Sequence, residues 1–347
     1  MKIATIIGAR PQFIKAATIS RVIKDRNDIT EVLIHTGQHY DTNMSEIFFN
    51  QLQIPEPDYN LEVGSAGHGK QTGQMLDRIE EVLIKEKPEW VLTYGDTNST
   101  VAGSLAAVKL HIPTAHVEAG LRSFNRKMPE EINRIATDHI SDLLFAPTQN
   151  AMRLLANEGL TEKAEFSGDV MYDSILFYSK ISNEKHRIPE MDGTDNYYLA
   201  TVHRPENTDN PERLQSIFSA FSKLDYPVIL PVHPRTKKLL EGIQFNDNVK
   251  IINPIGYLEM IYLLKNSHKV LTDSGGLQKE AYFMEKACIT LRDQTEWVET
   301  LDHNWNFIVA ADKEKILEKI HINNLGPRSN AFGYGHAAEK IVQNLEL

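Results

Sequence analysis

Residues 269–280 read Lys-Val-Leu-Thr-Asp-Ser-Gly-Gly-Leu-Gln-Lys-Glu, which predicts a short apolar strand, a tight turn and a helix. The turn contains Ser274, Gly275 and Gly276, and glycine lets a backbone come close to a ligand. A helix N-terminus favours phosphate because its first N–H groups are free. Glu280 follows within reach of a hydroxyl beside that phosphate, such as a ribose hydroxyl. The stretch therefore predicts a cradle for a nucleotide diphosphate.

The competing interpretation of this stretch is an ordinary strand-to-helix turn capped by Asp273 or Ser274. The rest of the chain favours the cradle, because short apolar strands and amphipathic helices alternate along most of it. Such alternation predicts parallel sheets with helices on both faces. We expect strands at residues 2–7, 31–36, 90–94, 114–117, 143–146, 197–201, 227–230, 249–252, 269–272, 288–291 and 307–309. We expect helices near residues 12–24, 71–85, 97–109, 130–141, 211–224, 257–264, 313–321 and 336–345.

A polar stretch at residues 182–196 interrupts the alternation and suits a loop. With 347 residues the chain has the length of two domains. We therefore expect an α/β protein of two Rossmann-like domains, residues 1–181 and 197–330, that face each other across a cleft. A C-terminal helix within residues 331–347 could pack back on the first domain. Ligands of such sheets bind beyond the C-terminal ends of the strands.

Composition excludes several classes of function. The formal net charge of −10 disfavours nucleic acid as a partner. The single cysteine, Cys288, lies in an apolar run, which predicts a buried and inert thiol. The sequence shows neither an apolar segment of signal-peptide length at its N-terminus nor a membrane-spanning run. We therefore expect a cytoplasmic protein without a membrane partner.

In the first half, polar residues follow the predicted strands. Arg10 and Lys15 come after the first strand and predict an anion site, although single basic residues are usually just solvated. Asp96, Glu118 and Glu130 follow later strands or open the next helix. Taken singly, these carboxylates could instead cap helices or favour their dipoles. Together they form a group at one sheet edge, where close carboxylates can divide acid and base roles.

In the second half, His203 and Arg204 directly follow one predicted strand, and His233 and Arg235 follow the next. A histidine with an arginine suits a diphosphate, or a proton donor to a leaving phosphate. A structural histidine that caps a loop is the alternative. The sequence has no HExxH, paired CxxC or Asp-rich metal loop, and no GxGxxG after the first strand. We therefore expect no metal and no nicotinamide cofactor.

Together these motifs resemble the non-hydrolysing UDP-N-acetylglucosamine 2-epimerases, over almost the whole chain. Their order and spacing are highly specific. The resemblance rests on Gly8-Ala9-Arg10-Pro11 with Lys15, Gln38-His39, Gly95-Asp96-Thr97, His116-Val117-Glu118-Ala119-Gly120-Leu121-Arg122, Pro129-Glu130-Glu131-Ile132-Asn133-Arg134, Thr272-Asp273-Ser274-Gly275-Gly276 with Glu280, and Arg292-Asp293.

The resemblance implies a glycosyltransferase-B type fold and an isomerase that inverts C2 of a UDP-2-acetamido sugar, as in the conversion of UDP-GlcNAc to UDP-ManNAc. In that family, UDP is eliminated to a bound glycal and added back without a cofactor. We also expect a homodimer with a role in polysaccharide biosynthesis. The expected catalytic residues are Asp96, Glu118, Glu130, His203 and Lys15. The expected UDP-sugar contacts are Arg10, Arg204, His233, Arg235, Ser274, Gly275, Gly276, Glu280 and Arg292.

Two segments depart from the UDP-GlcNAc branch. Ala9-Arg10-Pro11-Gln12 replaces Thr-Arg-Pro-Glu, and Thr295-Glu296-Trp297-Val298-Glu299 replaces Thr-Glu-Arg-Pro-Glu. Both look more like the branch that acts on UDP-2,3-diacetamido-2,3-dideoxy-glucuronate, which is the alternative substrate. Two rival functions are a UDP-sugar glycosyltransferase of the same fold and a non-catalytic nucleotide-sugar sensor. Fold alone does not separate them, but the carboxylates of the first half favour proton transfer at carbon.

Overall fold

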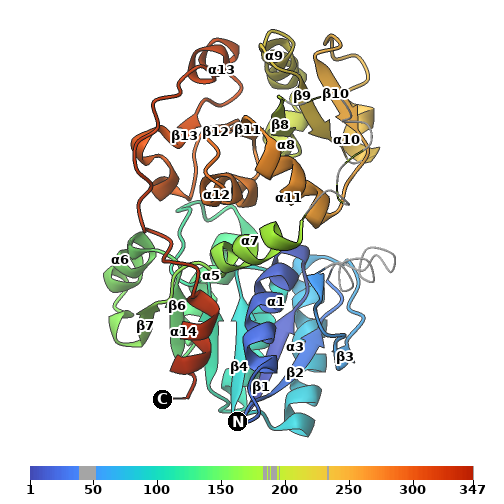
Figure 1. The fold of residues 1–347 in the computed structure, drawn as a ribbon. Coiled ribbons are helices and arrows are strands. Elements are labelled where there is room, and N and C mark those ends of the chain that lie inside the picture. Colours follow the sequence, from blue (N-terminus) through green and yellow to red (C-terminus); the bar gives the residue numbers. More distant parts are fainter. Residues whose placement is uncertain are drawn as a thin grey trace. The chain divides into compact units, whose positions relative to one another are not determined.

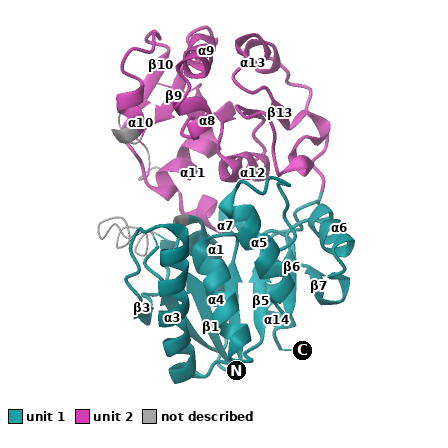
Figure 2. Ribbon diagram, turned by 180° about the vertical axis from the view of Figure 1, so that it is seen from behind, with its two compact units in different colours: residues 1–176, 330–347 teal, residues 177–329 magenta. Residues whose placement is uncertain are grey.

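The computed structural model describes residues 1–38, 52–182, 186, 188, 194, 196–232 and 234–346 (Figure 1). The chain divides into two compact units, which Figure 2 shows in two colours. Unit 1 comprises Met1–Leu176 and Asn330–Leu347, and unit 2 comprises Phe177–Ser329. Each unit is built around a parallel sheet of its own.

Unit 1 contains a seven-stranded sheet in the order β3-β2-β1-β4-β5-β6-β7. All neighbouring strands run parallel, so their C-terminal ends share one edge. The order reverses direction between β1 and β4, and ligands of doubly wound sheets bind at such a switch point. The strands are β1 (Lys2–Ile7), β2 (Thr30–His35), β3 (Tyr59–Asn60), β4 (Trp90–Tyr94), β5 (Thr114–Val117), β6 (Leu143–Ala146) and β7 (Ala164–Phe166).

Helices of unit 1 bury apolar stripes against this sheet. Met75 and Ile79 of α3 share a core with Ala102 of α4 and with Ile6 and Ile34 of the strands, as the 3.6-residue spacing predicts. The helices are α1 (Arg10–Lys24), α3 (His68–Glu86), α4 (Asn98–Lys109), α5 (Pro129–Ile140), α6 (Gln149–Asn157), α7 (Val170–Ile181) and α14 (Ala337–Asn344).

Unit 2 contains a six-stranded parallel sheet in the order β10-β9-β8-β11-β12-β13. Its order reverses between β8 and β11, so the stretch at 269–280 begins with a strand at the switch point. The strands are β8 (Tyr198–Thr201), β9 (Val228–Pro231), β10 (Val249–Ile252), β11 (Lys269–Thr272), β12 (Cys288–Thr290) and β13 (Asn306–Ile308). The helices are α8 (Pro205–Thr208), α9 (Pro211–Phe221), α10 (Pro234–Leu239), α11 (Tyr257–Asn266), α12 (Gly275–Phe283) and α13 (Lys313–Lys319).

The expected α/β class with two Rossmann-like sheets is confirmed, and most predicted strands lie within one or two residues of the observed ones. The structure adds β3 and β7, which have two and three residues. Strands this short carry little of the alternating pattern on which the sequence prediction depends. The sequence analysis also omitted the helices α6, α7, α8 and α10. Most of the predicted loop at 182–196 lies outside the described residues.

Residues near the C-terminus belong to unit 1. Helix α14 packs against α1, and its Ala338 N–H donates to the Asp173 carboxylate at 2.8 Å. Lys340 donates to the Phe166 carbonyl. The division between the units falls inside α7, after Leu176. Unit 1 therefore consists of two stretches of chain separated by the whole of unit 2.

No helix among the described residues is long and apolar enough to cross a membrane.

Candidate active site

In unit 1, two loops at the C-terminal edge of the sheet bring a lysine and a glutamate together. The Lys15 Nζ lies 2.5 Å from Glu118 Oε1, and both side chains are about nine-tenths buried. Lys15 comes from α1 and Glu118 directly follows β5. Glu118 has a φ of +73°, a region that L-residues rarely occupy and that clusters at functional sites.

Gly95 makes room for this pair. It follows β4 with a φ of +64°, and a Cβ added there would lie 3.2 Å from Lys15 Nζ and 3.7 Å from Glu118 Oε1. Its N–H donates to the Val117 carbonyl at 3.0 Å. Glycine is required at this position because the backbone both turns left-handed and touches the ion pair.

Asp96, the next residue, is held by helix α5. Arg134 forms an ion pair with its carboxylate, and Asn133 donates to its backbone carbonyl at 3.0 Å. Arg134 also contacts Glu131 at 2.8 Å. The same stretch of helix thus carries two residues that fix Asp96, and the sequence analysis did not assign either of them to the site.

Glu131 is the buried glutamate of the Pro129-Glu130-Glu131 segment. Its carboxylate accepts the Ser123 and Phe124 N–H groups at 2.9 and 2.8 Å. Burial by itself would raise the pKa of Glu131, but the hydrogen bonds from Ser123 and Phe124 and the charge of Arg134 hold it below its usual value. Glu130 is exposed, and among the described residues it forms no hydrogen bond or ion pair with Asp96 or Glu118. Its assignment to the catalytic set therefore stays a prediction.

In unit 2, Asp273 organises the loops after β8 and β11. It is fully buried, and its carboxylate accepts the His203 N–H at 3.1 Å and the Arg204 N–H at 3.0 Å. Asn207 donates to the same carboxylate at 3.1 Å. The His203 ring is half exposed, with its Nδ1 3.3 Å from Asp273. Asp273 is therefore a structural anchor that positions His203 beside the start of α12.

Ser274 is the N-cap of α12, and its hydroxyl accepts the Leu277 N–H at 3.4 Å. The first turn of this helix also faces a carboxylate, because a Cβ added at Gly275 would lie 2.7 Å from Glu296 Oε1. Arg292 is buried and contacts the other Glu296 oxygen at 2.9 Å. A Cβ at Gly276 would approach only Ser274 Oγ, at 3.9 Å. This helix N-terminus thus has an acidic and a basic side chain beside it.

Glu280 lies one turn further along α12 and is 8% exposed. Its carboxylate accepts the Tyr257 hydroxyl at 3.0 Å. Three further predicted contacts, Arg10, His233 and Arg235, have side chains outside the described part of the structure, as has His39.

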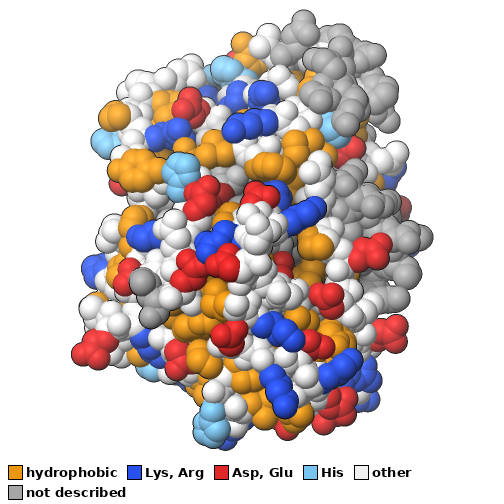
Figure 3. All heavy atoms as spheres, turned by 60° about the horizontal axis from the view of Figure 1, so that its bottom comes forward, with side chains coloured by type: hydrophobic (Ala, Val, Ile, Leu, Met, Phe, Trp, Pro, Cys, Tyr) orange, Lys and Arg blue, Asp and Glu red, His pale blue; other side chains and the backbone are white. Residues whose placement is uncertain are grey.

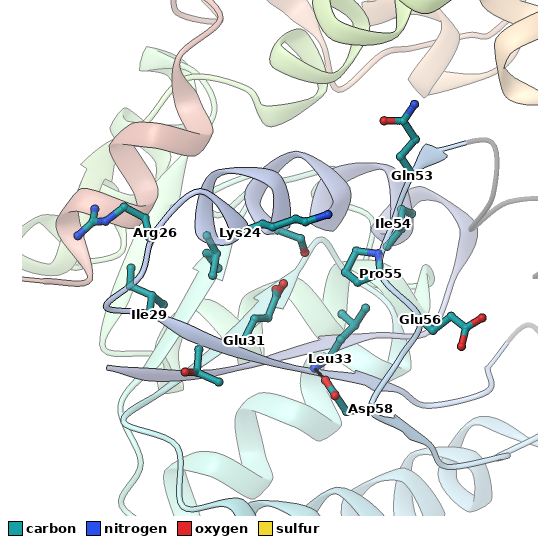
Figure 4. A pocket seen from close by; sticks show the side chains of 13 residues that line it. Lys24, Arg26, Ile29, Glu31, Leu33, Gln53, Ile54, Pro55, Glu56 and Asp58 are labelled. Carbon is teal, nitrogen blue, oxygen red and sulfur yellow. Dashed lines mark hydrogen bonds between the residues drawn. The ribbon is translucent and has the colours of Figure 1, made fainter.

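A separate cavity of about 630 Å³ lies elsewhere in unit 1 (Figure 4). It is lined by the end of α1, the start of β2 and residues 53–58 before β3, including Lys24, Glu31 and Asp58. These positions are at the opposite sheet edge from Asp96 and Glu118, so the cavity is not part of the candidate site. On the face drawn in Figure 3, basic and acidic side chains are interspersed.

Known proteins of one family are similar to this chain over almost its whole length. A family model described as UDP-N-acetylglucosamine 2-epimerase matches residues 21–346. The chain is 55% identical to a UDP-N-acetylglucosamine 2-epimerase homolog of Methanococcus maripaludis, with 99% of each chain covered. It is 51% identical to the UDP-2,3-diacetamido-2,3-dideoxy-D-glucuronate 2-epimerase of Pseudomonas aeruginosa, again with 99% of each covered.

Among solved structures, the UDP-GlcNAc 2-epimerase of Methanocaldococcus jannaschii in complex with UDP-GlcNAc and UDP is similar, with a TM-score of 0.90 and 47% identity. The match covers 100% of this chain and 99% of that one. Fold and sequence together define an α/β nucleotide-sugar isomerase. The chain belongs to the UDP-N-acetylglucosamine 2-epimerase family.

Proposed function

We propose that this protein inverts C2 of a UDP-activated 2-acetamido sugar by eliminating UDP and adding it back. The observation that supports this most directly is the pair of carboxylates beside Gly95. Glu118 is paired with Lys15 and Asp96 with Arg134, so both carboxylates are held in place by a basic side chain. Carboxylates held in place after adjacent strands suit proton transfer at a carbon atom.

In the proposed reaction, one carboxylate removes the proton from C2 while the C1–O bond breaks. The bonding pair leaves with UDP, and a C1=C2 double bond forms. The reverse step returns a proton to C2 on the opposite face, and the UDP oxygen bonds to C1 again. The reaction needs no oxidant, because the C2–H electrons form the double bond and the C1–O electrons leave with UDP. Lys15, which is buried beside Glu118, would stabilise negative charge during this exchange.

We assign nucleotide binding to the α12 region of unit 2. Free N–H groups at a helix N-terminus bind phosphate, and Arg292 lies beside them. A diphosphate bound there would displace the Glu296 carboxylate and pair with Arg292 in its place. Glu280, already oriented by Tyr257, would accept hydrogen bonds from the ribose.

The sugar has two candidates, UDP-GlcNAc and the 2,3-diacetamido glucuronate. Gln12, Trp297 and Val298 are positions at which the sequence departs from the UDP-GlcNAc branch. Gln12 is buried and fully hydrogen-bonded, because it accepts the Gly8 and Ala9 N–H groups and donates to the Tyr94 carbonyl. The glutamine at position 12, which replaces the glutamate of the UDP-GlcNAc branch, therefore has a structural role. Trp297 is also buried, with the Lys279 ammonium 3.7 Å from its ring centre, whereas Val298 is 46% exposed.

One experiment tests the activity and separates it from its rivals. The protein is incubated in deuterated water with each UDP-sugar alone, and C2 is followed by NMR. An epimerase incorporates deuterium at C2 and produces the C2 epimer without an acceptor. A glycosyltransferase or a sensor leaves C2 protonated, and that result with both sugars would refute the proposal. The sugar with the higher kcat/KM identifies the branch.

We also propose a cytoplasmic homodimer. Sedimentation of the purified protein would test the dimer, and fractionation of cells would test the compartment.

A further inference from the structure

A buried histidine lies between the two loops that carry Asp96 and Glu118. His116, on β5, is fully buried. Its Nε2 lies 2.6 Å from the Gly95 carbonyl oxygen, and its Nδ1 lies 2.7 Å from Asp138 Oδ1 on α5. The ring therefore contacts the turn before Asp96 on one side and helix α5 on the other.

The hydrogen-bond partners of His116 indicate how its ring nitrogens bond. A carbonyl oxygen only accepts hydrogen bonds, so Nε2 must donate to Gly95. Burial by itself would raise the pKa of Asp138, but the hydrogen bond from His116 and the charges of His116 and Arg122 hold it below its usual value. His116 thus links the Asp138 carboxylate on α5 to the turn that precedes Asp96.

The second oxygen of Asp138 reaches the other loop. It accepts the Gly120 N–H at 3.1 Å and the Arg122 Nη1 at 2.7 Å. Gly120 lies two residues after Glu118. Asp138 thus fixes the Glu118 turn directly and, through His116, the Gly95 turn. Both turns have left-handed backbones at Gly95 and Glu118, and such strained conformations persist only where the surroundings over-determine them.

We propose that His116 and Asp138 are a positioning pair, which sets the distance between the Asp96 and Glu118 carboxylates. Within the described part of the chain, neither His116 nor Asp138 forms a hydrogen bond or ion pair with the Asp96 or Glu118 side chain, so the pair acts through the two turns. The inference rests on the proposed function, since it assigns a purpose to the spacing of those carboxylates. A displacement of about 1 Å can cost roughly 100-fold in rate, so loss of the pair should lower turnover strongly.

The test uses three variants of the full chain. His116→Asn keeps a donor near Asp138 but cannot reach the Gly95 carbonyl. Asp138→Asn replaces one carboxylate oxygen with an NH₂ group, so the side chain can no longer accept hydrogen bonds from both His116 and the Glu118 turn. For each single variant, kcat should fall by about 100-fold, while the dissociation constant of UDP stays within about three-fold because UDP binds unit 2. The double variant should be no worse than the poorer single one, because both changes break the same connection.

Ile79→Ala serves as the control for general destabilisation. Ile79 is fully buried in the α3 core of unit 1 and makes none of the hydrogen bonds described for the two turns. It should lower the melting temperature but leave kcat of the folded protein near normal. An equal loss of kcat in Ile79→Ala, or additive losses in the double variant, would reduce His116 and Asp138 to ordinary structural residues.

A second measurement does not depend on activity. The ¹⁵N spectrum of histidine-labelled protein should show one ring with a protonated, hydrogen-bonded Nε2, and that signal should vanish in His116→Asn. An Nε2 without a proton would overturn the inference, because it could not donate to the Gly95 carbonyl. If the wild type fails to exchange C2 hydrogen, the proposed function fails. If it exchanges and His116→Asn does so equally well, only the positioning role fails.

Discussion

Lys15 and Glu118 are 103 residues apart in the chain, and their side chains meet at 2.5 Å. The contact exists because α1 leaves the sheet after β1, while Glu118 follows β5, with β4 and its Gly95 turn between them. Parallel pairing places the C-terminal ends of all three strands at one edge. The ion pair is therefore a product of sheet topology, and each of its parts can be tested alone.

Glu118→Gln should lower kcat by about 10²–10⁴, the range for loss of a general acid or base. UDP affinity should hold within a few-fold, because the nucleotide is assigned to unit 2. Steady-state kinetics and calorimetry measure the two quantities. Glu81→Gln, an exposed site on α3, makes the same charge change and should leave both intact. Near-normal turnover of Glu118→Gln would remove this residue from the mechanism.

Gly95→Ala should reduce turnover even though it adds only a methyl group. Alanine in a left-handed conformation costs roughly 1–2 kcal/mol, and its Cβ would lie 3.2 Å from Lys15 Nζ. Gly73→Ala is the matched control, because Gly73 lies inside helix α3 with nothing within 4 Å of its Cβ position. That change should stabilise the protein by about 0.5–1 kcal/mol and keep activity. Equal behaviour of the two variants in kinetics and urea unfolding would contradict this.

Glu280→Ala should weaken UDP binding by about 1.5–3 kcal/mol, the scale of a hydrogen bond to a charged group. Tyr257→Phe should cost less, because Glu280 remains and loses only the hydroxyl that orients it. Titration calorimetry with UDP measures both. Unchanged affinity in Glu280→Ala would show that this carboxylate does not contact the ribose.

Asp173→Asn should make the free energy of unfolding less dependent on pH. Burial raises the pKa of Asp173 from 3.8 to about 6, although the Ala338 N–H opposes the shift. The folded state therefore prefers the protonated acid. The stability that this preference contributes is complete below pH 3.8 and is lost as the pH rises through 6. Urea unfolding should show the variant gaining on the wild type from pH 4 to 7, by at most about 3 kcal/mol. If the difference in unfolding free energy between the variant and the wild type did not change with pH, the raised pKa of Asp173 would be contradicted.

Cys288 should resist thiol reagents in the folded protein. It is 1% exposed, and burial raises the pKa of its thiol to about 12, so almost no reactive thiolate forms at neutral pH. One thiol should react promptly in urea and hardly at all in buffer, as a colorimetric thiol assay would show. Prompt reaction under native conditions would mean that β12 opens locally.

Much of this site could be predicted from sequence because strand-end motifs are local. Glu118 and Ser274 lie in the turns after apolar strands, and Lys15 lies in the helix that follows the first strand. By contrast, adjacent residues such as Glu130 and Glu131 look equivalent in a helix start, and only packing decides which one is buried. The contact between His116 and Asp138 spans 22 residues and depends on how α5 lies against the sheet. The contact between these two side chains therefore cannot be predicted from their spacing in the sequence.

Unit 1 takes its first strand from the start of the chain and α14 from the end. A ribosome therefore releases Lys15 and Glu118 long before it releases the helix that covers α1. During synthesis, unit 2 can complete its sheet while unit 1 still lacks its closing piece. A stop codon near residue 330 would remove few residues, yet it would leave α1 uncovered and Asp173 without its N–H partner. Residues 330–347 thus complete unit 1 only after all of unit 2 has been synthesised.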